Sequence, residues 1–119
     1  MNFHSLYDQG FARVAAVTVP VHPAQPLANA NEVIDVAREL DAKGVAAAVF
    51  PELGISGYAI DDLLLQDVVL DEVTEALHRI AVQTKDLLPI LIVGAPIRND
   101  GSLYNCAVTI HRGKILGVT

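Results

Sequence analysis

The chain has 119 residues, which suits one domain, and it is 52% hydrophobic and 18% charged, a composition that excludes a disordered protein. The net charge of −6 comes without any cluster of Lys or Arg, which argues against nucleic acid as a partner. No apolar run approaches the roughly 18 residues of a membrane span, and the N-terminal stretch lacks the basic region of a signal peptide. With Cys106 as its single cysteine, the chain fits a reducing, cytoplasmic environment.

The first part of the chain predicts a β-α-β unit. Residues 11–19 are a nearly continuous apolar run rich in valine, the pattern of a strand buried on both faces. Three prolines in the segment 20–26 then interrupt the chain. Asn29 and Glu32 have the spacing of a capping box, which predicts the start of an amphipathic helix that ends at a Lys-Gly pair. A second buried strand at 45–50 completes the unit.

The middle of the chain predicts a second helix and a third strand. From Asp61 onward, apolar residues recur every three to four positions, and either Asp61 or Asp62 can cap the helix. Asp71 offers a point at which a separate helix could begin. The run 88–96 predicts another buried strand, which we expect to end at Pro96.

The last part of the chain predicts an antiparallel meander. Asn-Asp-Gly at 99–101 is a strong hairpin signal and leads into a strand at 103–110. A second turn at 111–114 leads into a short apolar strand at 115–118. The order of elements is therefore β-α-β-α-β-β-β, with parallel strands first and antiparallel strands last. This order predicts an α/β fold with a mixed sheet.

Glu52 stands directly after the predicted strand 45–50, in the stretch PELGISGY. Ligands of open α/β sheets gather at the carboxyl ends of strands, so this position favours a catalytic carboxylate that acts as a general base. Pro51 stiffens the exit from the strand, while Gly54 and Gly57 would let backbone amides approach a ligand closely. The alternative is a glutamate that merely ends a strand and is satisfied by the neighbouring backbone.

The other reactive side chains have structural explanations. Cys106 lies inside a predicted strand with no base beside it in the sequence, which is typical of a small buried side chain. No two of the histidines have the i, i+4 spacing of metal ligands: His4, His22, His78 and His111. No glycine-rich phosphate-binding motif follows the first strand. We therefore expect neither a metal nor a bound cofactor in this chain.

The stretch VFPELGISGYAIDDLLLQ (49–66) resembles the nitrilase, or carbon–nitrogen hydrolase, superfamily. The surrounding strands agree, since ARVAAVTV is similar to that family's first strand, LPILIVGAPI to its third, and LYNCAVTIHRGKILGV to the hairpin that follows. More narrowly, DDLLLQD and the opening MNFHSLYDQGFARVAA resemble the glutaminase domains of bacterial glutamine-dependent NAD⁺ synthetases. The resemblance covers essentially the whole chain and implies an α-β-β-α sandwich, of which this chain would form a part with helices on one face of its sheet.

The resemblance also implies a catalytic triad of Glu, Lys and Cys, whose thiol attacks the side-chain amide of glutamine. Glu52 matches the triad glutamate, which is the general base, and Tyr58 matches a tyrosine that helps to shape the glutamine pocket. The family's lysine and cysteine lie in segments that this sequence lacks, and neither Lys114 nor Cys106 matches them. We therefore expect residues 1–119 to be the N-terminal part of a truncated glutaminase domain that is inactive by itself.

A complete protein of this kind would have further parts. The resemblance implies a synthetase domain, absent here, that uses ATP and Mg²⁺ to amidate nicotinic acid adenine dinucleotide with the ammonia released from glutamine. It implies glutamine as the substrate and homo-oligomers of the full-length protein. Because part of a sandwich leaves apolar area uncovered, we also expect an exposed sheet face and association of this chain.

Two other functions stay open at this point. The chain could belong to a superfamily member that hydrolyses another amide, a nitrile or an N-carbamoyl compound. It could also be a complete, non-catalytic α/β module whose acidic surface binds a protein. Cooperative unfolding of a monomer would favour the module, whereas association would favour the partial sandwich.

Overall fold

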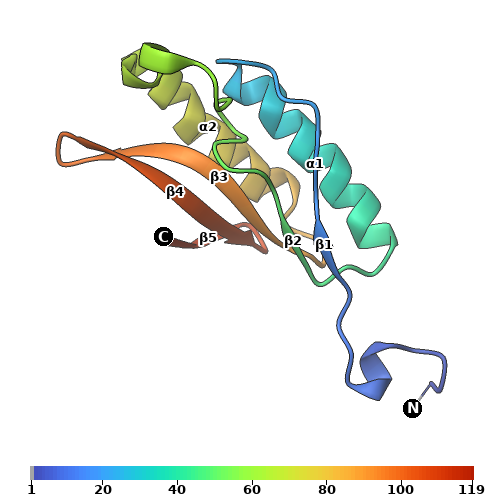
Figure 1. Ribbon diagram of the computed structural model, residues 1–119. Helices are drawn as coiled ribbons and strands as arrows, with labels where there is room; N and C mark the ends of the chain where they lie inside the picture. Colours follow the sequence, from blue (N-terminus) through green and yellow to red (C-terminus); the bar gives the residue numbers. More distant parts are fainter. Residues whose placement is uncertain (1) are drawn as a thin grey trace.

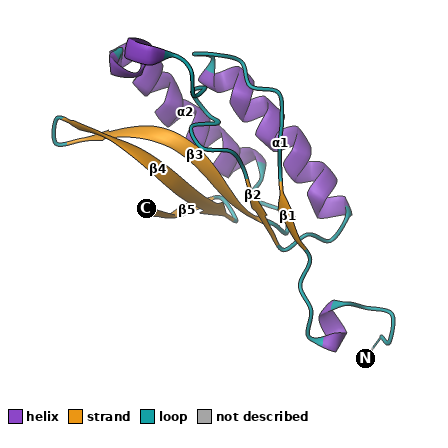
Figure 2. Ribbon diagram, in the orientation of Figure 1, coloured by secondary structure: helices purple, strands orange, loops and turns teal. Residues whose placement is uncertain are grey.

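The computed structural model describes residues 2–119 and has two layers, a five-stranded sheet and a pair of helices (Figure 1). Both helices lie on the same face of the sheet, and within the described residues no helix covers the other face (Figure 2). The elements in chain order are η1 (Tyr7–Gln9), β1 (Val14–Ala16), α1 (Pro26–Ala42), β2 (Ala47–Val49), η2 (Asp61–Leu65), α2 (Asp67–Gln83), β3 (Ile90–Asn99), β4 (Ser102–His111) and β5 (Lys114–Val118).

The strand order in the sheet is β1-β2-β3-β4-β5, so strands that follow one another in sequence are also neighbours in space. β1, β2 and β3 are parallel, and α1 and α2 lie in the long connections that parallel strands require. β3, β4 and β5 are antiparallel and are joined by tight turns. The predicted order of elements and the predicted mixed sheet with helices on one face are confirmed.

The hydrophobic core lies between the sheet and the helices. β3 directs Leu91, Val93 and Ala95 toward the helices at alternate positions, and none of them is more than 1% exposed. α2 packs against them with an apolar stripe that includes Val73 and Ile80, both fully buried. This packing makes β3 the central support of the sheet, and the segment that follows β2 rests on it.

The opposite face of the sheet is apolar and open. Val14 of β1 and Val49 of β2 alternate with alanines that face the core, and they are 70% and 47% exposed. A trough of about 220 Å³ runs across β1 and β2 to Ile92 of β3. The exposed apolar sheet face that a partial sandwich predicts is therefore present in this chain.

The first helix begins earlier than the capping-box spacing predicts. α1 starts at Pro26, whose fixed φ suits the first position of a helix, so Asn29 lies inside the helix and is not its cap. The buried Asn29 side chain accepts a hydrogen bond from the His22 backbone N–H at 2.7 Å and donates to the carbonyls of His22 and Ile55, each at 2.9 Å. Asn29 thus joins the proline loop to the segment that follows Glu52.

The prediction that Asp61 or Asp62 caps the second helix is wrong. These residues open the short 3₁₀ helix η2 without any side-chain capping bond, and Asp61 has a φ of +48° where an N-cap needs extended backbone. α2 begins after Gln66 and continues without a break through Asp71. The second helical segment is therefore one 3₁₀ turn followed by one α-helix.

The strands differ from the prediction in length. β1 and β2 have three residues each, and β3 continues past Pro96 to Asn99. Ile92 and Gly94 direct their carbonyls away from β4, toward the segment that follows β2. Pro96 has the same orientation in the strand, so its missing N–H removes no hydrogen bond from the β3–β4 ladder.

Both predicted hairpin turns are confirmed. Asp100 and Gly101 have φ values of +48° and +80°, and Arg112 and Gly113 have values of +52° and +81°. Left-handed backbone at both central residues is the geometry of the type I′ turn, whose twist matches that of the flanking strands. These turns set the β3–β4 and β4–β5 registers.

Candidate active site

Glu52 lies in a turn whose two ends are both anchored to β3. Before it, the Phe50 N–H donates to the Ile92 carbonyl at 2.9 Å, and after it, the Ile55 N–H donates to the Gly94 carbonyl at 3.0 Å. These bonds place Glu52 just beyond the carboxyl end of β2, against the central strand. This is the end of a parallel strand at which open α/β sheets bind their ligands.

Gly94 allows this turn to lie directly on the sheet. A Cβ atom at Gly94 would lie 2.5 Å from the Leu53 nitrogen and 2.6 Å from the Pro51 carbonyl oxygen, which is too close for any side chain. Gly94 is therefore part of the support for Glu52, although motif reasoning did not include it. A glycine inside a buried strand was the sequence signal for such a close approach.

The glycines of the turn itself serve a different purpose from the one predicted. The Gly54 N–H donates to the Pro51 carbonyl at 3.1 Å, and the Gly57 N–H donates to the Leu53 carbonyl at 2.8 Å. Both N–H groups therefore donate within the turn and are not available to a ligand, which corrects the expectation that they approach one. Gly57 has a φ of +92°, a conformation that glycine adopts without strain.

The Glu52 carboxylate borders an open cleft of about 400 Å³ on the uncovered face of the sheet. Its Oε1 accepts a hydrogen bond from Nδ2 of Asn105 on β4. Among residues 2–119, no basic side chain lies within ion-pair distance of this carboxylate. Glu52 is thus exposed, held by one neutral donor and not neutralised by a cation, and such a group can accept a proton.

Tyr58 follows the turn but does not line the cleft that contains Glu52. Its side chain is 69% exposed. The left-handed backbone at Gly57 redirects the chain immediately before it. The assignment of Tyr58 to a substrate pocket therefore stays a prediction.

Cys106 borders the same cleft, but its side chain does not face Glu52. It follows Asn105 on β4, and adjacent residues of a strand point to opposite faces of the sheet. Its partner in the ladder is Ala95, which faces the helices. Lys114 is exposed at the start of β5 and does not line the cleft. Neither side chain is placed to act together with Glu52.

The described part of the chain holds neither a metal-binding cluster nor a helix suited to a bilayer. No group of three His, Cys, Asp or Glu side chains within residues 2–119 is close enough to bind a metal ion. His22 instead contacts Glu32, with 3.1 Å between Nε2 and Oε1. No helix in the same range combines the length and apolarity needed to cross a membrane.

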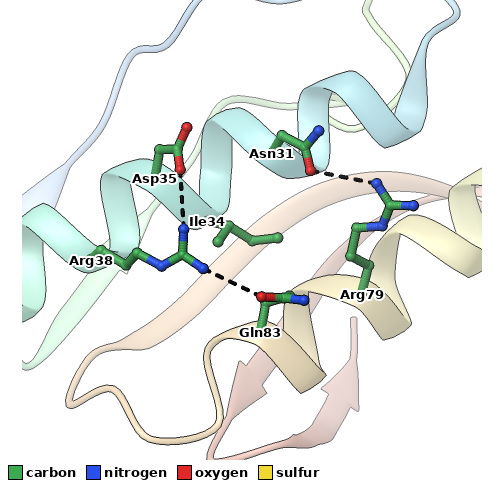
Figure 3. Close-up of a pocket in the computed structure, with 6 residues that line it drawn as sticks. All are labelled: Asn31, Ile34, Asp35, Arg38, Arg79 and Gln83. Carbon is green, nitrogen blue, oxygen red and sulfur yellow. Dashed lines mark hydrogen bonds and ion pairs between the residues drawn. The ribbon is translucent and has the colours of Figure 1, made fainter.

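A second hollow, of about 490 Å³, lies between α1 and α2 (Figure 3). Arg38 of α1 donates to Asp35 and to Gln83 of α2, both at 3.3 Å. Arg79 of α2 donates across the hollow to Asn31 of α1 at 3.5 Å. Each guanidinium group thus joins the helices through a hydrogen bond to a neutral side-chain amide of the other helix.

The chain is similar to one protein family and to curated proteins of known name. The family model described as carbon-nitrogen hydrolase matches residues 13–119. The chain belongs to the carbon–nitrogen hydrolase family. The glutamine-dependent NAD(+) synthetases of Mycobacterium tuberculosis and Mycobacterium leprae are 53% and 50% identical to it over 118 residues. Each match covers 99% of this chain and 17% of the relative, so the chain spans about a sixth of the length of these proteins.

Solved structures of the family share the fold. A glutamine-dependent NAD(+) synthetase from Cytophaga hutchinsonii matches with a TM-score of 0.82 and 29% identity, over 90% of this chain and 18% of that one. An amidase from Nesterenkonia matches with a TM-score of 0.77 and 21% identity, over 90% of this chain and 41% of that one. These likenesses confirm the nitrilase-type α/β fold.

Proposed function

We propose that this chain is the N-terminal part of the glutaminase domain of a glutamine-dependent NAD⁺ synthetase, with Glu52 as the general base. The observation that carries the proposal is the 53% identity over 118 residues to synthetases whose name includes their dependence on glutamine. The position of Glu52 supports it, because an accessible carboxylate at the end of a parallel strand lies where α/β enzymes bind substrates.

In the proposed reaction, Glu52 accepts the proton of a cysteine thiol that a segment outside this chain supplies. The thiolate attacks the side-chain carboxamide carbon of glutamine, and the proton leaves with ammonia as the γ-glutamyl thioester forms. Glu52 then accepts a proton from water, whose oxygen attacks the thioester. Glutamate is released, and the proton returns to the thiol. One base serves both half-reactions, so its carboxylate must keep its position through both.

The proposal also covers the substrate pocket, the synthetase domain and the assembly of the full-length protein. Tyr58 would help to shape the glutamine pocket, and its exposed ring is free to contact a substrate. The released ammonia would pass to a synthetase domain that uses ATP and Mg²⁺ to amidate nicotinic acid adenine dinucleotide. The full-length protein would be a cytoplasmic homo-oligomer. Residues 1–119 alone would not hydrolyse glutamine, because a general base without its nucleophile has nothing to activate.

Substrate comparison tests the proposal. The full-length gene product is incubated with ATP, Mg²⁺ and nicotinic acid adenine dinucleotide, and with glutamine, a simple aliphatic amide, a nitrile or an N-carbamoyl amino acid at equal concentration. We expect glutamine to give glutamate and NAD⁺ in similar amounts, and ammonium chloride to replace glutamine. Preferred hydrolysis of any of the other compounds, without NAD⁺ formation, would contradict the proposal and favour the alternative hydrolase.

A further inference from the structure

We infer that Asn105 is a positioning residue for Glu52: its carboxamide holds one oxygen of the carboxylate and leaves the other free for proton transfer. The inference rests on the proposed role of Glu52 as the base. Asn105 comes from β4, two strands away from β2, and its Nδ2 donates to Oε1 of Glu52. It lies outside the PELGISGY stretch and brings a second, distant part of the chain into the site.

The register of the hairpin explains why Asn105 can reach Glu52. Gly94 pairs with Ala107 and Pro96 pairs with Asn105, so these four residues share the face of the sheet that no described helix covers. The Glu52 turn rests on Gly94 of that same face. Because Gly94 has no side chain, it leaves room on this face of β3 for the turn that holds Glu52.

The donor is more firmly fixed than the acceptor. β4 pairs with β3 from Ser102 to Ile110, and Asn105 lies opposite Pro96 in this ladder, whereas the pairing of β4 with β5 begins at Val108. Beside Asn105, Ala107 exchanges backbone hydrogen bonds with Thr119 at 2.8 and 3.0 Å. Both side chains are exposed, but Asn105 lies within a strand of the sheet and Glu52 lies in a turn. We infer the direction of the effect from this difference: a side chain on a regular strand of the sheet orients the carboxylate on the turn.

The chemistry of the pair suits a carboxylate that accepts a proton through its other oxygen. A carboxylate only accepts hydrogen bonds, so it is the amide nitrogen of Asn105 that faces Glu52. A neutral amide fixes the orientation of the carboxylate without adding a charge of its own beside it. Within residues 2–119, Asn105 supplies the side-chain hydrogen bond to this carboxylate, and no cation contacts it.

The first test measures catalysis in the full-length gene product. Asn105→Leu keeps the approximate volume and removes the donor, and we expect it to lower kcat for glutamine hydrolysis about 10- to 100-fold, the worth of one hydrogen bond to a charged group. We expect KM for glutamine to stay within about twofold, because the substitution changes the base and not the binding of glutamine. Ammonium-dependent NAD⁺ formation should also stay within about twofold, because the synthetase domain catalyses it without the glutaminase site. Asn105→Gln keeps an amide donor and should recover part of kcat. Asn99→Leu, in the same hairpin, is the matched control.

The second test needs no activity and uses the 119-residue chain. In wild type, NMR should show one Asn105 side-chain amide proton shifted downfield and exchanging more slowly with water than those of exposed Asn99. Glu52→Ala should remove both effects, and Asn99→Leu should leave them unchanged. These signals report the contact itself, whatever reaction the protein performs.

The outcomes separate this inference from the proposed function. If wild-type protein hydrolyses no glutamine, the proposed function fails, and the NMR comparison alone decides whether Asn105 holds Glu52. If glutamine is hydrolysed but Asn105→Leu keeps kcat within about twofold of the Asn99→Leu control, Asn105 does not position the base. The inference is equally overturned if Asn105→Leu lowers glutamine- and ammonium-dependent rates by the same factor, or if Glu52→Ala leaves the Asn105 amide signals unmoved.

Discussion

Replacing Gly94 by alanine places a methyl group where the Glu52 turn rests on β3. The new Cβ would lie 2.5 Å from the Leu53 nitrogen and 2.6 Å from the Pro51 carbonyl oxygen. Both are backbone atoms, so the turn as a whole must move away from the strand. That movement also breaks or stretches the hydrogen bond from the Ile55 N–H to the Gly94 carbonyl.

The size of the effect follows from these two losses. Overpacking costs about 1–3 kcal/mol, and one backbone hydrogen bond contributes about 1 kcal/mol. We therefore expect Gly94→Ala to lower the free energy of unfolding by about 2–4 kcal/mol. In urea denaturation of the 119-residue chain, the midpoint should fall by about 1–3 M. Hydrogen exchange at the Phe50 and Ile55 amides should become faster, because these amides anchor the turn.

Gly117→Ala is the matched control for this prediction. Gly117 lies in β5, and no heavy atom lies within 4 Å of the Cβ that alanine would add there. Its substitution should change the free energy of unfolding by no more than about 0.5 kcal/mol. If Gly94→Ala and Gly117→Ala unfold at the same urea concentration, the turn does not rest on Gly94.

Three further predictions concern stability and association. Asn29→Ala removes a buried carboxamide that makes three hydrogen bonds, and it should lower the free energy of unfolding, measured by urea denaturation, by about 2–4 kcal/mol. An equal loss for Asn31→Ala, at an exposed position, would contradict this. Gly101→Ala should lower the free energy of unfolding by about 1 kcal/mol, because alanine is strained at a φ of +80° although the added Cβ meets no neighbour. An unchanged free energy of unfolding in the same assay would show that this strain is absent. Val49→Lys should weaken self-association of the 119-residue chain in sedimentation velocity, whereas unchanged association would exclude the uncovered face as the contact.

Local signals in the sequence predicted the local structure well. The turns at Asp100-Gly101 and Arg112-Gly113 were predictable because the residues that adopt left-handed backbone are the same residues that form the turn. The start of α1 was not, because two local signals compete there. Pro26 begins the helix, while Asn29 uses its side chain in a tertiary contact with Ile55.

The site was only partly predictable, for a physical reason. Glu52 could be identified because its position after a strand and its motif both lie within one short stretch of sequence. The roles of Gly94 and Asn105 depend on the β2–β3 and β3–β4 registers, which bring distant segments together only in the folded chain. Nothing in the sequence around Gly94 or Asn105 indicates that both lie beside Glu52 until those registers are known.

The role of Glu52 as the base is tested most sharply by the Glu52→Gln substitution in the full-length gene product, assayed for NAD⁺ formation with glutamine and, separately, with ammonium chloride. The carboxamide that replaces the carboxylate keeps the size of the side chain but cannot accept the proton. We expect the glutamine-dependent rate to fall on the order of 10²- to 10⁴-fold, while the ammonium-dependent rate stays within about twofold of wild type. A glutamine-dependent rate that stays close to that of wild type would contradict the assignment of Glu52 as the base.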